Sequence, residues 1–258
     1  MPRRKPLAGL VIIATACLCA AAAPLLSAYD PAATSLQSLD PPSAAHWLGT
    51  DELGRDILSR VIYGARISLT VGIGAALVAT LIGVPVGLCA GYLGGGADLL
   101  VVQIVDLFIA LPGLVLALII TAMVGPSLKN LVLVLGFVMW PPIARMVRGQ
   151  TLAVRESLFV EAARAVGGGA VWIIRRHIWP NILHVAAAQF AVTIAFAIFT
   201  SSSLSFLGLG VPPPTPDWGG MVRVGFDYLI INPAMSLSPG IAVAITVAGF
   251  YLLGSREA

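Results

Sequence analysis

Six apolar runs, separated by polar segments, dominate the chain. They cover residues 7–28, 67–91, 99–124, 131–144, 185–207 and 237–253. A helix that rises about 1.5 Å per residue needs about 20 apolar residues to cross about 30 Å of hydrocarbon. The fourth run falls short of that length unless it extends to Val147. The pattern predicts an all-α integral membrane protein with about six transmembrane helices.

The first run has two interpretations. The basic residues Arg3, Arg4 and Lys5 before it, and the tripeptide Leu26-Ser27-Ala28 at its end, are typical of a secretory signal peptide. However, the apolar stretch 7–28 is longer than the core of a signal peptide, which has about 7–15 residues. We therefore expect an uncleaved first span.

The composition agrees with a bilayer environment. Of the 258 residues, 58% are hydrophobic and only 10% are charged, whereas soluble domains have roughly 45–50% apolar and about 25% charged residues. So few charges cannot cover a globular surface in water, which excludes a soluble globule. The high hydrophobicity also excludes intrinsic disorder. Cys17, Cys19 and Cys89 lie in apolar runs, where we expect small buried hydrophobic residues.

The basic residues predict the orientation of the spans. Positively charged loops stay in the cytoplasm, so a cytoplasmic N-terminus and C-terminus give ten of the fifteen basic residues an inside position. The inside set is Arg3, Arg4, Lys5, Arg145, Arg148, Arg155, Arg164, Arg175, Arg176 and Arg256, and the outside set is Arg55, Arg60, Arg66, Lys129 and Arg223. The net charge of +3 thus reflects topology, and no nucleic acid partner is expected. The large cytoplasmic segment is then 145–181, and the external segments are 29–66 and 208–236.

Glycines and prolines inside the runs indicate how the helices pack. Gly83, Gly87 and Gly91 are spaced four residues apart on one helix face, where the missing Cβ atoms allow close approach of a neighbouring backbone. Pro85, Pro112 and Pro142 lie within or at the ends of spans. Each removes a backbone donor, so we expect a kink at each one.

The sequence lacks the motifs of an enzyme. There is no Gly-x-x-x-x-Gly-Lys-Ser/Thr phosphate loop, so ATP hydrolysis by that route is excluded. His46, His177 and His184 are too far apart in sequence to indicate a metal site. We expect a non-catalytic chain that binds no cofactor or metal.

Asp106 is the one carboxylate inside a predicted span. A charged group at such depth is costly when unpaired, so it must pair with a neighbouring helix or reach interfacial water. We expect this structural role, and a role in gating, together with nearby Pro112, is the alternative.

The predicted cytoplasmic segment contains a short amphipathic helix. Apolar or small residues recur at Phe159, Ala162, Ala163 and Val166, and the glycines 167–169 should end the helix. A second helical stretch, 171–178, should end at Pro180. The two helices predict a compact helical hairpin. The alternative interpretation is an amphipathic hairpin that lies on the membrane surface.

These residues resemble the cytoplasmic EAA loop of ABC importer permeases. Glu161-Ala162-Ala163, then Gly167, then Ile178-Trp179-Pro180 carry the resemblance. It implies that Glu161, Ala162, Ala163, Gly167, Ile178 and Pro180 couple the permease to a separate ATPase subunit. ATP and Mg would then bind to that partner, in keeping with the missing phosphate loop.

Two further segments narrow the resemblance. Residues 48–66, with Gly49, Thr50, Asp51, Gly54, Arg55 and Asp56, are similar to the external segment of the dipeptide/oligopeptide/nickel permease group. Residues 205–219 resemble the loop between the last two spans of that group. The chain is similar to the C-type permease, which implies a B-type permease partner, one or two ATPase subunits, an external binding protein and a peptide substrate. Residues 1–66 would form the first helix and external segment, and 67–258 the core with its loop at 149–181.

The sequence departs from that group at four places. Gln103 replaces an arginine expected three residues before Asp106, and Trp179 replaces a leucine before Pro180. Residues 232–235 lack an expected tryptophan, and the tail after Leu253 is short. None of these departures touches the docking core.

Other functions remain open at this point. Nickel and glutathione importers share this permease architecture, so the cargo is not determined. An autonomous channel or secondary transporter would have inverted repeats and several charged groups at mid-depth, and the sequence has no clear repeat and only Asp106. A lipid-binding sensor would tolerate scrambling of residues 155–176, whereas a docking loop would not.

Overall fold

The computed structural model describes residues 4–255 of the chain. These residues form an elongated helical bundle with no strand, apart from one isolated β-bridge between Thr50 and Asp56. Arg3 and Arg256, which contribute to the predicted orientation, lie outside the described residues. The predicted all-α class is confirmed.

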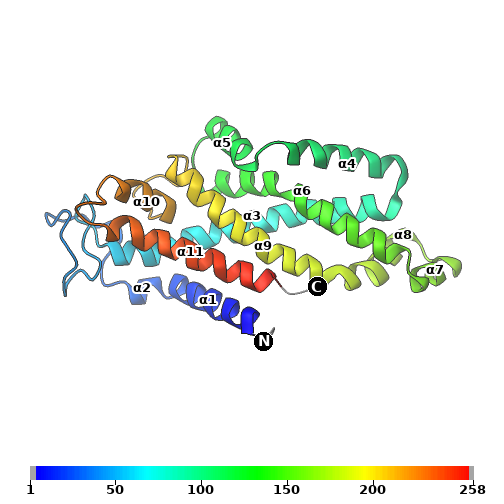
Figure 1. Cartoon of the computed structure of the whole chain (residues 1–258), viewed down its shortest axis with the longest axis horizontal. Coiled ribbons are helices and arrows are strands. Elements are labelled where there is room, and N and C mark those ends of the chain that lie inside the picture. The colour runs from blue at the N-terminus through cyan, green and yellow to red at the C-terminus, as the bar shows by residue number, and fades with distance from the viewer. Residues whose placement is uncertain (1–3, 256–258) are drawn as a thin grey trace.

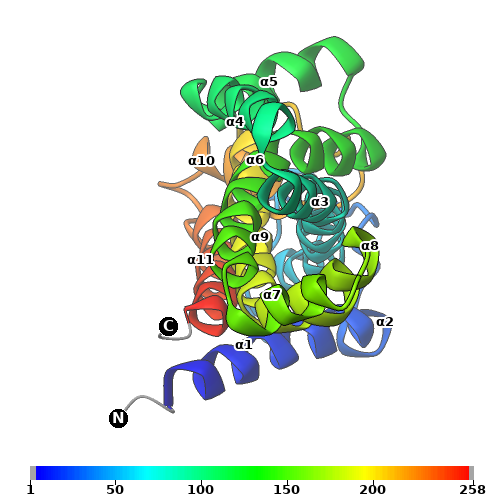
Figure 2. The same ribbon diagram turned by 90° about the vertical axis from the view of Figure 1, so that its right-hand side faces the viewer.

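Four long helices run along the bundle (Figure 1). They are α3 (Ile57–Leu93), α6 (Leu128–Arg155), α9 (Trp179–Phe206) and α11 (Ala234–Gly254). Shorter elements complete the order: α1 (Arg4–Ala21), α2 (Ala23–Leu26), α4 (Gly95–Ala110), α5 (Gly113–Val124), α7 (Leu158–Ala165), α8 (Ala170–Ile173), a π-helical turn (Ile174–Ile178) and α10 (Trp218–Phe226). Seen end-on, α1 and the α4–α5 pair lie on opposite sides of the bundle (Figure 2).

The α3–α6 pair forms the centre of the bundle through the predicted glycine face. A Cβ atom on Gly83 would lie 2.7 Å from the Trp140 carbonyl oxygen, and one on Gly87 would lie 2.6 Å from that of Ala144. On Gly91 it would lie 2.7 Å from the Cβ atom of Thr151. Only glycine permits this approach, which confirms the prediction that these residues pack against a neighbouring backbone.

The third predicted span is not one helix. Residues 99–124 belong to α4 and α5, which are bent by 85° at Leu111-Pro112. Leu111 is extended, with ψ 136°, because the proline ring disfavours a helical conformation in the preceding residue. Pro112 therefore breaks the span and does not merely kink it.

The first predicted span is also interrupted. The run 7–28 is divided between α1 and α2, which meet at Ala22. Pro24, in the first turn of α2, has no N–H to bond to the preceding turn, which accounts for the break. α1 packs on α11, since a Cβ atom on Gly9 would lie 2.7 Å from the Gly249 carbonyl oxygen.

Two other boundaries differ from the prediction. α3 begins at Ile57 and runs without interruption through residues 66 and 67. α6 continues through Pro141 and Pro142 to Arg155, so the segment predicted to be a loop from Arg145 begins only at Glu156. Hydropathy falls at Arg145, but arginine is a good helix former, so the helix continues past the end of the apolar run. Arg145, Arg148 and Arg155 have partners on neighbouring helices.

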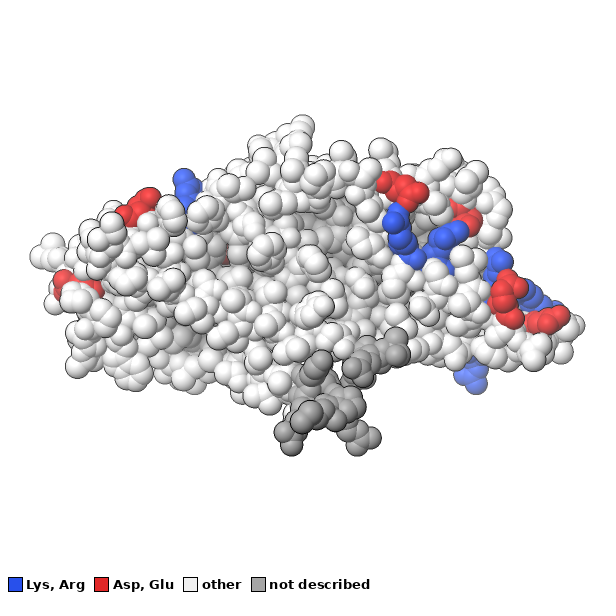
Figure 3. Space-filling model, viewed as in Figure 1, with Lys and Arg blue, Asp and Glu red and all other residues white. Residues whose placement is uncertain are grey.

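Within residues 4–255, four helices have the length and composition to cross a membrane, and the α4–α5 pair brings the number to five if it counts as one span. The four are α3, α6, the run Ala170–Phe206 and α11. On the face in Figure 3, the charged residues lie toward the two ends of the long axis, and a broad uncharged zone separates them. That distribution suits a bilayer around the middle of the bundle.

Replacing Gly87 with alanine tests the close packing of α3 on α6. We expect Gly87→Ala to lower the free energy of unfolding by about 1–3 kcal/mol, because the new methyl group overlaps the Ala144 carbonyl. Gly96→Ala in α4 is the matched control, since a Cβ atom there meets nothing within 4 Å. Thermal unfolding in detergent measures both, and equal melting temperatures would contradict the packing argument.

Candidate functional sites at the two ends of the bundle

The helical hairpin of α7 and α8 forms one end of the bundle (Figure 2). On α7, Val160 and Ala163 face inward and are buried in a core cluster with Ile173 and Ile178. On its outer side, Leu158 is 83% exposed, and Val166, just after the helix, is 82% exposed. The predicted short helix is confirmed, but Val160 and Ala163 form its buried side, whereas Phe159, Ala162 and Val166 of the predicted apolar face are exposed at the tip.

Gly167 ends α7 through its backbone conformation. Its φ of 86° is left-handed, which glycine adopts without strain. The Gly167 N–H donates to the Arg164 carbonyl at 2.9 Å, and the Gly168 N–H donates to that of Ala163 at 3.0 Å. These two bonds form a Schellman motif. The expectation that the glycine run ends this helix is confirmed.

The second helical stretch does not end at Pro180. The helix continues from Ala170 to Phe206, with the π-helical turn between α8 and α9. In that turn the Trp179 N–H bonds to the Ile174 carbonyl, five residues back. Pro180 then stands in the first turn of α9, where a missing N–H is tolerated. The hairpin is thus continuous with a membrane-length helix.

The predicted coupling residues occupy two layers. Glu161, Ala162, Gly167 and Pro180 are exposed, whereas Ala163 and Ile178 are buried in the core cluster. The exposed members can meet another protein directly. The buried members pack the hairpin against the bundle.

Two ion pairs join α4 to α6. Arg148 donates to both carboxylate oxygens of Asp98: Nε donates to Oδ1, and Nη2 donates to Oδ2 at 2.7 Å. Arg145 pairs with Asp106. Arg155, at the end of α6, donates to the Gly91 carbonyl at 3.2 Å and to that of Tyr92 at 3.3 Å. Asp106 therefore has a partner on a neighbouring helix, as expected, although the sequence did not identify which one.

At the opposite end, Asp51 organises the turn before α3. Its Oδ1 accepts the N–H groups of Leu53 and Arg55 at 3.0 and 2.9 Å. Its Oδ2 lies 2.6 Å from Arg55 Nε and 3.3 Å from Arg60 Nε. Arg55 also reaches Glu52 Oε1 at 2.8 Å. Carboxylates and guanidinium groups are thus paired in a largely buried cluster.

The other predicted residues of this segment hold its backbone. Asp56 caps α3 by accepting the Ser59 N–H at 2.8 Å, and it lies 2.9 Å from His46 Nδ1. Gly49, with φ 79°, and Gly54, with φ 70°, need glycine at turns where a Cβ atom would also collide with other backbone. Thr50 Oγ1 accepts the Asp40 N–H at 2.9 Å. The structure brings all six residues together as a folded, buried turn.

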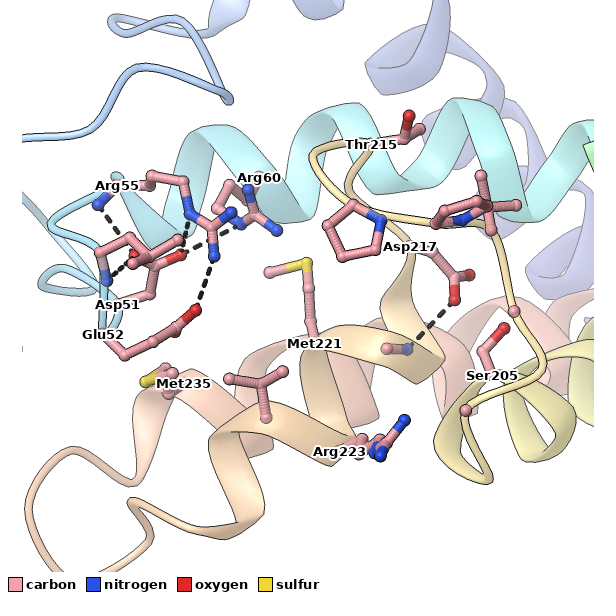
Figure 4. Close-up of a pocket in the computed structure, with 18 of the residues that line it drawn as sticks. Asp51, Glu52, Arg55, Arg60, Ser205, Thr215, Asp217, Met221, Arg223 and Met235 are labelled. Atoms are coloured by element: carbon pink, nitrogen blue, oxygen red, sulfur yellow. Dashed lines mark hydrogen bonds and ion pairs between the residues drawn. The ribbon is translucent and has the colours of Figure 1, made fainter. Parts of the chain in front are cut away.

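A cavity of about 340 Å³ lies between this turn and α10. Figure 4 shows Asp51, Glu52, Arg55 and Arg60 on one side, and Met221, Arg223 and Asp217 on the other. The loop 208–215 after α9 completes the wall. The sequence did not predict the cavity, because its two walls are more than a hundred residues apart in the chain.

Asp217 stands in this wall as the N-cap of α10. Its carboxylate accepts the Gly220 N–H at 3.1 Å. Burial of the side chain raises its pKa above the ordinary range, since the charged form loses its hydration, while hydrogen bonds to the carboxylate oppose the shift. Within residues 4–255, no group of three or more His, Cys, Asp or Glu side chains could hold a metal ion.

Residues 83–256 match the model of the family described as "Binding-protein-dependent transport system inner membrane component". The chain belongs to this family. The match includes α6, the α7 hairpin, α9 and the cavity wall of α10, and α3 from Gly83 onward. Permease subunits of this family lie in the inner membrane, which agrees with the apolar spans of the bundle.

Curated relatives carry two kinds of cargo in their names. A glutathione transport system permease protein of Pectobacterium atrosepticum is 42% identical over 83% of this chain and 71% of its own length. A dipeptide transport system permease protein of Alkalihalophilus pseudofirmus is 40% identical over 95% of this chain and 81% of its own. A probable D,D-dipeptide transport system permease protein of Escherichia coli K12 is 39% identical over 95% of this chain and 82% of its own length.

A solved structure shares the fold. A chain from an inward-facing form of the MetNI methionine ABC transporter superposes with a TM-score of 0.63 and 22% identity. The match covers 78% of this chain and 95% of the other. The predicted type I ABC importer permease fold is confirmed.

Replacing Asp217 with asparagine tests the effect of its burial. A carboxyl group whose pKa is higher in the folded than in the unfolded state loses stabilising free energy as the pH rises through those values. We therefore expect the melting temperature of Asp217→Asn to exceed that of wild type increasingly as the pH rises from about 4 to about 8. Asparagine caps a helix as well as aspartate. Asp227→Asn, at an exposed position, is the control, and parallel curves for D217N and wild type would refute the argument.

Proposed function

We propose that the chain is one permease subunit of an ATP-driven importer for dipeptides or oligopeptides, and that it lines half of the translocation pathway. The α7 hairpin would dock on a separate ATPase subunit. The observation that carries this proposal is the apolar tip at Leu158 and Val166, on a hairpin whose second helix continues into the membrane-length run Ala170–Phe206. An exposed amphipathic helix of this kind fits a groove on a partner protein.

The proposal gives the bundle an orientation. The α7 end lies in the cytoplasm and the α10 end faces outward, with six spans when α1 and the bent α4–α5 pair each count as one. The bias of basic residues toward the α7 end supports this assignment, since Arg164, Arg175 and Arg176 all lie in or beside the hairpin. The turn at Asp51 and the cavity beside α10 then lie at the external face.

The two layers of the hairpin divide the work of coupling. Leu158, Glu161, Ala162 and Val166 would contact the ATPase, because they are exposed on or just after α7. Ala163 and Ile178 would transmit its movement, because they are packed in the core. A docked partner can drive a conformational change only if its contacts differ between the two states of the permease.

The assembly would contain four kinds of subunit. Besides this chain we propose a homologous B-type permease, one or two ATPase subunits that bind ATP and Mg, and an external binding protein that delivers cargo. The family description, which names a binding protein, supports the last of these. This chain itself would bind no cofactor.

Glutathione is the second candidate cargo. It is favoured because the chain is 42% identical to the glutathione permease from Pectobacterium atrosepticum and 40% identical to the dipeptide permease. Both cargoes are short peptides, so one pathway chemistry would serve either. Uptake of a labelled dipeptide, measured with and without excess glutathione, separates the two.

The bent α4–α5 pair would act as a gate along the pathway. It is held to α6 by the Asp98–Arg148 and Asp106–Arg145 pairs, and its outer face carries large exposed apolar side chains such as Leu107 and Met123. Charge pairs between helices can form in one state and separate in another. Asp106 would thus supply the ion-pair partner of Arg145, and Pro112 would be the hinge between α4 and α5.

Exchange of charges tests the gate. We expect Asp106→Asn and Arg145→Gln each to lower peptide uptake by about threefold or more, because either change removes the α4–α6 pair. The double variant D106R/R145D should recover most of the activity. Lys129→Gln, at an exposed site, is the control. Failure of the double variant to recover would argue against the pair as a gate element.

Glycine substitution in the hairpin tests the docking function itself. We expect Gly167→Val to abolish dipeptide uptake while the subunit stays in the membrane. The left-handed conformation of Gly167 costs a non-glycine residue about 1–2 kcal/mol, so the valine backbone should leave this conformation and displace the tip of the hairpin. Gly169→Val is the matched control, since Gly169 has φ −71° and open space around its Cβ position. Copurification of the ATPase should be lost only with G167V. Undiminished uptake by G167V would overturn the proposal in favour of a channel or a lipid-binding sensor.

A further inference from the structure

The hairpin and α9 are joined by an irregular piece of backbone. The π-helical turn Ile174–Ile178 adds one residue to a helical turn. Two residues later, Pro180 has no N–H to donate to the preceding turn. In the same stretch, the Asn181 side chain donates from Nδ2 to the His177 carbonyl at 2.5 Å. Single π turns within α-helices are rare and frequently occur at functional sites.

The ring of His177 lies at the centre of this joint. Its centroid is 4.9 Å from that of Trp172 on α8, in an edge-to-face arrangement, and 6.2 Å from that of Phe159 on α7. The ring therefore touches both helices of the hairpin from its place in the π turn. Aromatic rings at such distances attract one another beyond their apolar burial.

The ring of His177 contributes to the fold through packing and not through a hydrogen bond of Nε2. Among the described residues, His177 Nε2 is buried without a hydrogen-bond partner. The contacts of this ring with Trp172 and Phe159 are therefore aromatic packing contacts, which a phenylalanine would also make. The core contacts of Val160, Ala163, Ile173 and Ile178 already hold the hairpin to the bundle.

The aromatic pair around His177 is open on its other side. Phe159 is 46% exposed and Trp172 is 50% exposed at the tip of the bundle. A protein docked on the hairpin would contact these two side chains, and both of them pack against the His177 ring. The ring is thus placed between the docking surface and the widened turn that begins α9.

We propose that His177 is a positioning residue for energy coupling: it passes displacement of the docked hairpin into α9 through the π turn. This inference rests on the proposed docking of an ATPase. It does not place His177 in contact with cargo or ATP. Its removal should uncouple ATP hydrolysis from transport while the ATPase stays bound.

The test compares ATP hydrolysed with peptide imported in the complete transporter, purified with its partner permease and ATPase and placed in lipid vesicles with its binding protein. We expect His177→Ala to retain the bound ATPase and its hydrolysis rate, while the ATP used per dipeptide rises by about tenfold. His177→Phe should restore the wild-type ratio, because it keeps the ring. His184→Ala, at an exposed position on α9, is the matched control.

The possible results separate this inference from the docking proposal. An unchanged ratio in H177A, or equal loss in H177A and H177F, would overturn the role of the ring. Loss of the bound ATPase in H177A would make His177 a docking residue and also overturn it. Trp172→Ala combined with H177A should be no worse than H177A alone, because both changes remove one contact. If G167V leaves uptake and ATPase association intact, the docking proposal itself has failed.

Discussion

The close approach of α3 to α6 is the constraint on which the rest of the structure depends. In a bilayer, apolar side chains gain little by turning away from lipid, so helices associate through tight van der Waals contact. The glycines at 83, 87 and 91 allow that contact over about two turns of α3. Because α3 is 37 residues long, the same helix reaches both ends of the bundle, where the candidate sites lie.

Each end of α3 is completed by side chains from elsewhere. At its start, Asp56 caps the helix, and the buried Asp51 cluster shapes one wall of the cavity beside α10. At its end, Arg155 from α6 covers the carbonyls of Gly91 and Tyr92. Arg164, beside Gly167, places its guanidinium over the Tyr92 ring, 5.4 Å from the centroid. The hairpin is therefore built directly on the α3–α6 pair.

This arrangement suits a permease subunit that changes its conformation. The rigid parts are the glycine-packed helices and the buried clusters at each end. The parts with fewer constraints are the bent α4–α5 pair, held to α6 by two ion pairs, and the π turn between hairpin and α9. A force applied at the hairpin would act first on these joints, since packed cores shift between discrete arrangements rather than deforming gradually.

The sequence by itself determined the membrane class, the glycine contact face, the short helix α7 and its end at Gly167, because each depends on spacing within a few turns of one helix. It also carried the resemblance to the permease family. Only the tertiary structure decided the 85° bend at Pro112, the continuation of α6 to Arg155, the π turn before Pro180, the Arg145 partner of Asp106 and the cavity beside α10. These features depend on which neighbour supplies a hydrogen bond, a charge or a wall, and periodicity along one chain segment contains no record of what lies beside it in space.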